Sequence, residues 1–198
     1  RHGQPVLQGG DGPGGVLPEG AALISGVLHH LPALLPIACP LSASYARLAP
    51  SSWSAPYQVW GIENREAALR LVPTSVDQVP AHLELKVADL GANPYLLLGS
   101  LQVLAMVALS EAVPLPEPVR GDPARVDGTT AAHARLPQSL AEGRTALASS
   151  AVLSAAMGEL LHGSVLDSID AEIARCEGLP PDQVIASTRW WPLVGGLS

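Results

Sequence analysis

The stretch that decides the fold is His82-Leu83-Glu84-Leu85-Lys86-Val87, which is followed by the dipeptide Asn93-Pro94. Its odd-numbered positions are apolar and its even-numbered positions are polar, so the spacing predicts a strand with one core face and one polar face. Asparagine is a favoured helix N-cap and proline a favoured first helical residue, so a long helix is predicted over residues 94–112. A half-buried strand that leads into a long helix indicates a mixed α+β domain.

Helical periodicity and turn residues place the other elements on both sides of this stretch. A helix over residues 21–38 contains Pro32 and Pro36, and each proline should kink or segment it because proline lacks the amide of an interior turn. We therefore predict an α+β fold with mostly antiparallel strands packed by helices and a helical C-terminal half. The other expected segments are an irregular stretch over 40–56, a turn followed by a strand within 60–72, an exposed connection over 113–135, and helices that begin near 137 and cover 153–176.

The composition excludes several classes of protein. The chain has 198 residues, of which 47% are hydrophobic and 15% charged, unlike the composition of disordered proteins. Its formal net charge is -7 and Lys86 is its single lysine, so a nucleic-acid-binding surface, which needs a basic face, is not expected. The longest apolar stretch, residues 96–109, is shorter than the ~20 residues that span a membrane, so it predicts a buried core helix and no membrane segment.

The cysteines and the start of the chain indicate a cytoplasmic protein whose sequence begins partway through. Cys39 and Cys176 lie far apart and fit no metal or redox spacing, as in reduced intracellular proteins. The chain opens without an initiator methionine, a cationic region or an apolar segment, so no signal peptide is predicted.

Four cations, Arg47, Arg65, Arg70 and Lys86, fall outside any helical pattern of alternating charge. Arginine grips carboxylate and phosphate oxygens through paired N–H donors, so these residues are candidates for anion binding. Arg65 and Arg70 would lie on opposite faces of a regular strand, and they converge only if Arg65 precedes the strand. The alternative is that each cation pairs with a local acid as ordinary surface charge, the candidates being Glu63, Glu66, Asp77 and Asp89.

Glu84 is the candidate metal ligand, because it is an acid in the middle of an otherwise apolar strand. A carboxylate carried by a strand is a rigid ligand for a hard divalent cation, and Mg²⁺ sites combine one or two carboxylates with phosphate oxygens. The alternative is a Glu84–Lys86 ion pair on a solvated face of the sheet.

Three sequence blocks together carry a resemblance to a known family. The blocks are Ser44-Tyr45-x-Arg47-Leu48-x-Pro50, Trp60-Gly61-x-x-Asn64-Arg65-x-Ala67-x-x-Arg70 and Leu83-Glu84-x-Lys86-x-x-Asp89-x-x-Ala92-Asn93-Pro94-Tyr95-Leu96. In the order, spacing and residue types of these blocks, the chain resembles the glutamine synthetase family. The resemblance is strongest over residues 3–112, and it is closer to the divergent ligases of the family than to its housekeeping enzyme.

The resemblance implies an ATP-dependent carbon–nitrogen ligase that joins ammonia or a small amine to the glutamate side-chain carboxylate through an acyl-phosphate. It implies that Arg47 and Lys86 bind the substrate, that Arg65 and Arg70 bind the nucleotide phosphates, and that Arg65 also acts in catalysis. It implies that Glu84 binds Mg²⁺ or Mn²⁺. It further implies nitrogen metabolism as the cellular role and a homo-oligomeric ring with active sites between subunits.

Three positions depart from the pattern of the family. Lys86 stands where the family carries a second substrate-binding arginine, and an ammonium group cannot reproduce a planar fork of donors. His82 replaces an arginine near the nucleotide, and Ser54 stands where a flap glutamate helps to deprotonate ammonium. These departures point away from plain glutamine formation.

The resemblance also implies that residues 1–198 are the C-terminal portion of a catalytic domain, without the N-terminal domain and the first part of the catalytic domain. The other metal-binding acids and the His-x-His strand of the family have no counterpart in this sequence. A single carboxylate cannot make a two-metal site, so we expect this chain alone to be inactive. The alternative is a non-catalytic structural or regulatory relative that kept the fold.

Overall fold

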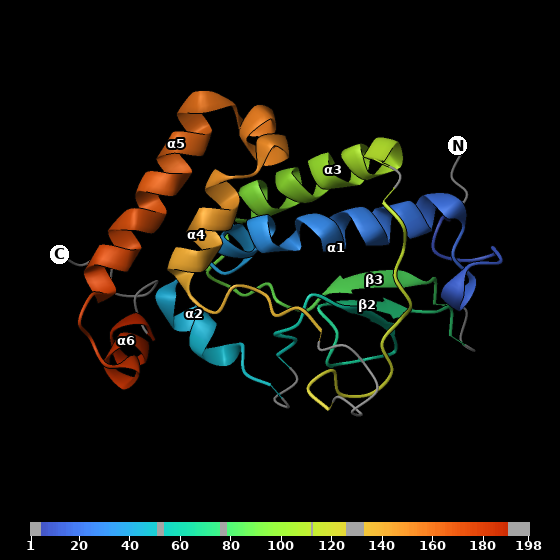
Figure 1. Cartoon of the computed structure of the whole chain (residues 1–198), viewed down its shortest axis with the longest axis horizontal. Helices are drawn as coiled ribbons and strands as arrows, with labels where there is room; N and C mark the ends of the chain where they lie inside the picture. Colours follow the sequence, from blue (N-terminus) through green and yellow to red (C-terminus); the bar gives the residue numbers. More distant parts are fainter. Residues whose placement is uncertain (1–4, 51–53, 76–78, 112, 126–132, 190–198) are drawn as a thin grey trace.

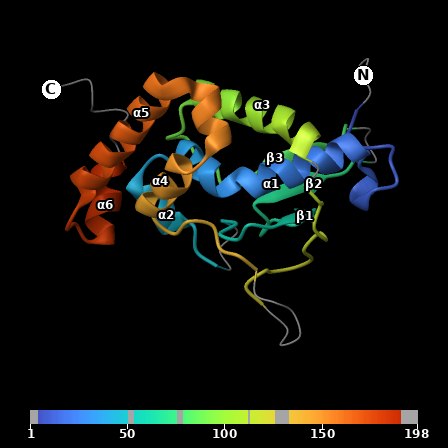
Figure 2. The ribbon, with the colours of Figure 1, turned by 45° about the horizontal axis from the view of Figure 1, so that its top comes forward.

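Helix α1 (Pro18–Ala38) runs between helix α3 (Pro94–Glu111) and a three-stranded sheet, so the molecule has three layers (Figures 1 and 2). The computed structural model describes residues 5–50, 54–75, 79–111, 113–125 and 133–189. The other elements are η1 (Pro13–Gly15), α2 (Ser42–Arg47), β1 (Trp60–Ile62), β2 (Leu69–Val72), β3 (His82–Leu85), α4 (Leu140–Ala148), α5 (Ala151–Cys176) and α6 (Pro181–Thr188).

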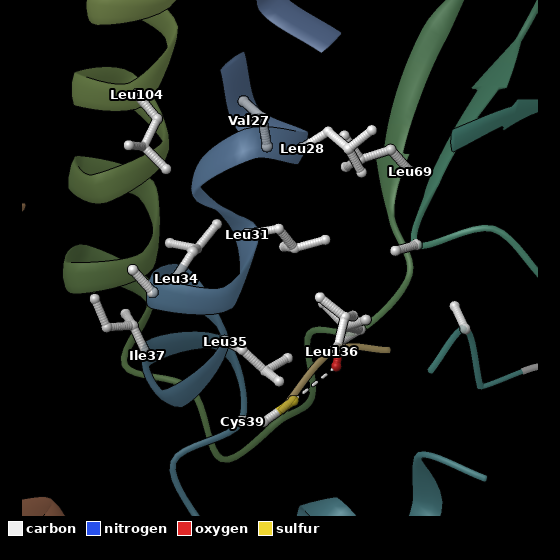
Figure 3. Packing of buried hydrophobic residues seen from close by; sticks show 14 of the residues in the cluster. Val27, Leu28, Leu31, Leu34, Leu35, Ile37, Cys39, Leu69, Leu104 and Leu136 are labelled. Carbon is white, nitrogen blue, oxygen red and sulfur yellow. Dashed lines mark hydrogen bonds between the residues drawn. The ribbon is translucent and has the colours of Figure 1, made fainter. Parts of the chain in front are cut away.

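The hydrophobic core lies on both sides of α1. Leu28 and Leu31 extend from α1 toward the strand that carries Leu69. Ile37 lies on the side of α1 that faces α3, the helix that carries Leu104 (Figure 3). Each of these side chains is at most 5% exposed. Burial of one such side chain contributes roughly 1.5–3 kcal/mol of transfer free energy, so α1 is the element that joins the sheet to the helical layer.

The two prolines do not divide α1, so the expectation of a segmented helix is wrong. The helix is continuous over its 21 residues. Pro32 has no N–H to offer to the carbonyl of Leu28, one turn earlier, and a buried carbonyl without a donor would destabilise the helix. The side-chain amide of Gln58 replaces that donor, because its Nε2 lies 2.8 Å from the Leu28 oxygen.

The sheet has the strand order β1-β2-β3. Strands β2 and β3 are antiparallel, as expected, but β1 pairs with β2 in parallel. Parallel neighbours usually need a long crossover. Here β1 is only three residues long, so the connection over residues 63–68 is long enough to return the chain to its start. The prediction of a mostly antiparallel sheet therefore holds for one of the two described pairings.

The predicted strand and long helix are confirmed, and other segments differ. Strand β3 and α3 follow the expected positions, and Asn93 caps α3 by accepting hydrogen bonds from the amides of Tyr95 and Leu96. Residues 42–47, expected to be irregular, form α2, and α6 was not predicted. The predicted helix end at Ala112 and the candidate acid Asp77 lie outside the described residues.

Helix α3 is not the buried core helix that its apolar sequence predicts. It buries one stripe, formed by Ser100, Leu104 and Ala108, because it packs on α1 from one side only. By length and hydropathy α1 and α3 would each be able to cross a membrane, but 67% of the apolar window of α1 is buried inside the domain, against 17% for α3. The burial of α1 is that of a core helix.

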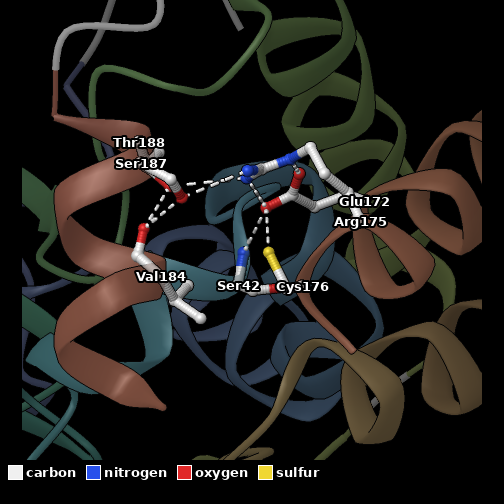
Figure 4. Close-up of polar contacts among 7 residues, drawn as sticks. All are labelled: Ser42, Glu172, Arg175, Cys176, Val184, Ser187 and Thr188. Carbon is white, nitrogen blue, oxygen red and sulfur yellow. Dashed lines mark hydrogen bonds and ion pairs between the residues drawn. The ribbon is translucent and has the colours of Figure 1, made fainter. Parts of the chain in front are cut away.

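A buried carboxylate ties the C-terminal helices to α2. Glu172 of α5 is 7% exposed, accepts a hydrogen bond from the backbone amide of Ser42 at 3.0 Å, and binds Arg175 through both of its oxygens (Figure 4). Arg175 also donates to the hydroxyls of Ser187 and Thr188 in α6. This network fixes α2, and with it Arg47 in the last turn of that helix, against the C-terminal half.

Candidate active site on strands two and three

An arginine and a glutamate face each other across the antiparallel pair. Arg70 of β2 is in register with Glu84 of β3, and Nη1 of the arginine lies 3.3 Å from Oε2 of the glutamate. The neighbouring residues Leu69 and Leu71 are buried on the opposite face of β2, so the alternation of the strand sends Arg70 to the polar face. The cross-strand pair brings together the predicted phosphate-binding arginine and the predicted metal ligand.

A second carboxylate holds the same guanidinium. Glu63, in the connection between β1 and β2, accepts a hydrogen bond from Nη2 of Arg70. This hydrogen bond raises the pKa of Arg70 above its ordinary value, and the charges of Glu63 and Glu84 raise it further against the opposing effect of burial. The sequence named Glu63 only as a possible local partner. The signal that could have found it is its place in the turn just before the strand.

Glu84 fits a metal site as one ligand. Its second oxygen, Oε1, lies 3.9 Å from Nε2 of His82, and its side chain is 35% exposed. Within the described residues no group of three histidine, cysteine, aspartate or glutamate side chains gathers to hold an ion. A hard cation at Glu84 would therefore take its remaining ligands from elsewhere, such as phosphate oxygens. The alternative Glu84–Lys86 ion pair is not found among the described contacts, where Glu84 pairs with Arg70 and His82.

Arg65 lies on the connection between β1 and β2, as its convergence with Arg70 requires. It is exposed and lines a pocket of about 550 Å³ that Glu63 also lines. Glu63 thus contacts Arg70 and lines the same pocket as Arg65. The pocket is completed by Ile62, Asn64, Glu66, Arg120, Gly121, Asp122 and Arg125.

Arg47 lies apart from this pair. Its Nη2 donates to the carbonyl of Val87 at 2.7 Å and lies 3.8 Å from Asp89 and from the thiol of Cys39. Among the described residues no hydrogen bond or ion pair joins Arg47 to Arg70 or Glu84. Glu63 therefore pairs with Arg70, and Asp89 pairs with Arg47. These pairs are the ones expected if the cations are ordinary surface charge.

Lys86 and Ser54 complete the positions that the sequence singled out. Lys86 follows β3 and anchors it through its backbone amide, which donates to the carbonyl of Ala68 at 2.9 Å. Ser54 is 4% exposed, and its hydroxyl donates to the carbonyl of Ala49 at 2.8 Å. The position of the expected flap glutamate therefore holds a buried hydroxyl that is engaged by the backbone.

Known proteins resemble this chain in sequence. The sequence profile of the glutamine synthetase catalytic domain matches residues 1–185. The gamma-glutamylpolyamine synthetase GlnA3 of Streptomyces coelicolor is 40% identical over 195 residues, which cover 96% of this chain and 42% of that protein. The glutamine synthetase of Frankia alni is 31% identical over 123 residues, or 62% of this chain and 26% of that protein.

Solved structures share the fold. A glutamine synthase homologue superposes with a TM-score of 0.78 at 30% identity, covering 94% of this chain and 42% of that structure. The ADP complex of GmaS, at 23% identity and a TM-score of 0.76, supports the fold alone. The chain thus spans about two fifths of the length of GlnA3 and of these structures. A profile match over most of the residues, together with the three blocks and the shared fold, places this chain in the glutamine synthetase family, within its catalytic domain.

Proposed function

We propose that the protein containing this chain is an ATP-dependent ligase that joins an amine to the side-chain carboxylate of glutamate through an acyl-phosphate. Two relatives that match the chain are named as a gamma-glutamylpolyamine synthetase and a glutamine synthetase. The observation that carries the proposal is the Arg70–Glu84 pair across β2 and β3, since it sets a cation of the type that suits phosphate oxygens beside a carboxylate of the type that suits a divalent metal.

The chemistry of phosphoryl transfer suits these residues. Its transition state spreads negative charge over the phosphoryl oxygens, so catalysis depends on positioning and on cations aimed at those oxygens. We assign that role to Arg65 and Arg70, and we assign the substrate carboxylates to Arg47 and Lys86. Glu84 would hold a divalent cation, Mg²⁺ or Mn²⁺, which when bound supplies positive charge to the phosphate oxygens.

The amine is proposed to be an aliphatic polyamine in preference to ammonia. The likeness to a gamma-glutamylpolyamine synthetase supports this choice. Ammonium and a protonated aliphatic amine must each lose a proton before attack. Ser54 offers no carboxylate to accept it, and its hydroxyl is buried against Ala49, so another group must serve as the base for either nucleophile. A homo-oligomeric ring and a cytoplasmic location belong to the same proposal.

The test is phosphate release by the intact protein containing this chain, supplied with ATP, glutamate and either ammonia, a polyamine or an aromatic amine. We expect release to require both glutamate and the amine, with the polyamine giving the highest kcat/KM. Phosphate release that is absent with every amine would instead support a non-catalytic relative that kept the fold.

The substitution Arg65→Ala tests the catalytic assignment. It should lower kcat at least about a hundredfold, because removal of one charge-stabilising donor typically costs that much or more. The melting temperature should change little, since Arg65 is exposed. The matched control is Arg144→Ala, which removes a half-buried arginine from an ion pair with Asp170 and should leave kcat unchanged. Equal losses of activity and melting temperature in Arg65→Ala would contradict the assignment.

A further inference from the structure

The guanidinium of Arg70 is held from two sides by two different elements. Nη1 faces Glu84 of β3 at 3.3 Å, and Nη2 donates to Glu63 of the connection that precedes β2. The side chain of Arg70 is only 16% exposed. Its Nε is buried and has no hydrogen-bond partner among the described residues. Within the described residues, Arg70 therefore makes its hydrogen bonds to these two carboxylates.

One carboxylate alone would leave this guanidinium poorly oriented. A single hydrogen bond to Nη1 fixes one point of a planar group, which can still turn about the contact. A second contact at Nη2 fixes the plane, and the planar fork is the property that suits arginine to bind phosphate oxygens with defined geometry. Glu63 supplies that second contact.

The backbone around Glu63 is fixed as firmly as its side chain. Glu63 has a positive φ of 51°, a left-handed conformation that costs a residue with a side chain about 1 kcal/mol or more. Its amide donates to the carbonyl of Leu71 at 2.9 Å, which continues the ladder between β1 and β2. A conformation of this cost persists because its surroundings determine it.

The next residue, Asn64, provides those surroundings. It is 8% exposed and donates from Nδ2 to the carbonyls of Val119 and Gly121, at 2.8 and 2.9 Å. Its Oδ1 accepts a hydrogen bond from the amide of Glu66 at 3.0 Å. The connection is thus bound to a segment more than fifty residues away, and Glu63 sits at its start.

We propose that Glu63 is a positioning residue, which sets the plane of the Arg70 guanidinium for the phosphate group that Arg70 binds in the proposed function. Glu63 also neutralises part of the charge of Arg70, and Glu84 contacts the arginine through Oε2 only. The other oxygen, Oε1, faces His82 at 3.9 Å and remains free of the arginine for a cation.

The test combines a structural and a kinetic measurement on the intact protein containing this chain. Crystal structures of the wild type and of Glu63→Ala should differ in Arg70, whose guanidinium should lose its wild-type plane. The kcat/KM for ATP of Glu63→Ala should fall about tenfold or more, while KM for glutamate stays within about twofold. Glu63→Gln keeps an acceptor oxygen at the same reach and should recover part of the loss.

The matched control is Asp170→Asn, which weakens the exposed ion pair with Arg144 and should change neither readout. A Glu63→Ala structure with Arg70 in its wild-type position would overturn the inference, as would an unchanged kcat/KM for ATP in an active enzyme. If the wild type releases no phosphate with any amine, the proposed ligase function fails, and the position of Arg70 in the two crystal structures still decides the role of Glu63.

Discussion

The substitution Gly26→Ala should destabilise the protein, although alanine is the better helix former. Gly26 lies on α1 where α3 crosses it, and a Cβ added there would lie 2.2 Å from Cβ and 2.9 Å from Cα of Ala108. Carbon atoms in contact are about 3.5 Å apart or more, so α3 must move by roughly 1.3 Å. The nearest atoms belong to a backbone and a methyl group, and no flexible side chain can turn away.

The magnitude follows from two opposing effects. Overpacking a close contact costs about 1–3 kcal/mol, and replacing glycine by alanine inside a helix returns about 1 kcal/mol. We expect a net loss of up to about 2 kcal/mol in the free energy of unfolding. For a domain of this size, that loss lowers the melting temperature by up to about 8 °C. Thermal unfolding followed by circular dichroism measures it.

Two further variants separate the contact from the helix propensity. Gly99 lies in α3, and an added Cβ would have no atom within 4 Å, so Gly99→Ala should raise stability by about 0.5–1 kcal/mol. Ala108→Gly combined with Gly26→Ala should recover part of the loss, because it removes the opposing methyl group. If Gly26→Ala stabilises the protein as much as Gly99→Ala does, the close crossing of α1 and α3 is refuted.

Gln58→Ala should cost about 1 kcal/mol in unfolding free energy, because it leaves the Leu28 carbonyl without its donor. In a Pro32→Ala background the helix regains an N–H, so the cost of Gln58→Ala should shrink. An equal cost in both backgrounds would contradict the reasoning. At pH 8 an alkylating reagent should modify Cys176 well before Cys39, since burial raises the pKa of the Cys39 thiol to about 12. Mass spectrometry of the native protein measures the labelling, and equal labelling of the two cysteines would contradict the prediction. Because the raised pKa favours the protonated thiol in the folded state, the titration of Cys39 should not change the free energy of unfolding below about pH 9 and should lower it as the pH rises from 9 to 12.

Local signals in the sequence were sufficient for the elements whose determinants are local. The alternation over residues 82–87 and the cap at Asn93 depend on neighbours within a few positions, and β3 and α3 appear where they were expected. The helices after residue 137 follow from the same reasoning, since Ser139 and Ser150 cap α4 and α5. The α+β class could be predicted from these elements alone.

Elements that depend on distant partners could not be predicted in the same way. The continuity of α1 through Pro32 requires the side chain of Gln58, which lies 30 residues from the Leu28 carbonyl that it binds. The parallel pairing of β1 requires a tight connection that Asn64 fastens to Val119 and Gly121. A single sequence shows the residues of such contacts but not their pairing.

The candidate site was predictable to the same extent. Arg70 and Glu84 were both singled out by residue type, but the register that places them opposite each other belongs to the pairing of β2 and β3. Arg47 was expected to bind the substrate, and in the structure its guanidinium contacts Val87 and Asp89. These contacts could not be predicted, because α2 was not expected and its last turn sets the position of Arg47.

The charge balance around Arg70 limits what this cluster can bind without help. One guanidinium stands between two carboxylates, so with His82 neutral the group carries a net charge of about -1, and it repels a phosphate and attracts a cation. A phosphate site must be positive, and among the described residues no ion pair joins this cluster to Lys86 or to the pocket-lining cations Arg65, Arg120 and Arg125. A divalent cation at Glu84 would reverse the balance at once. This is the physical reason to regard Glu84 as a metal ligand in the proposed enzyme.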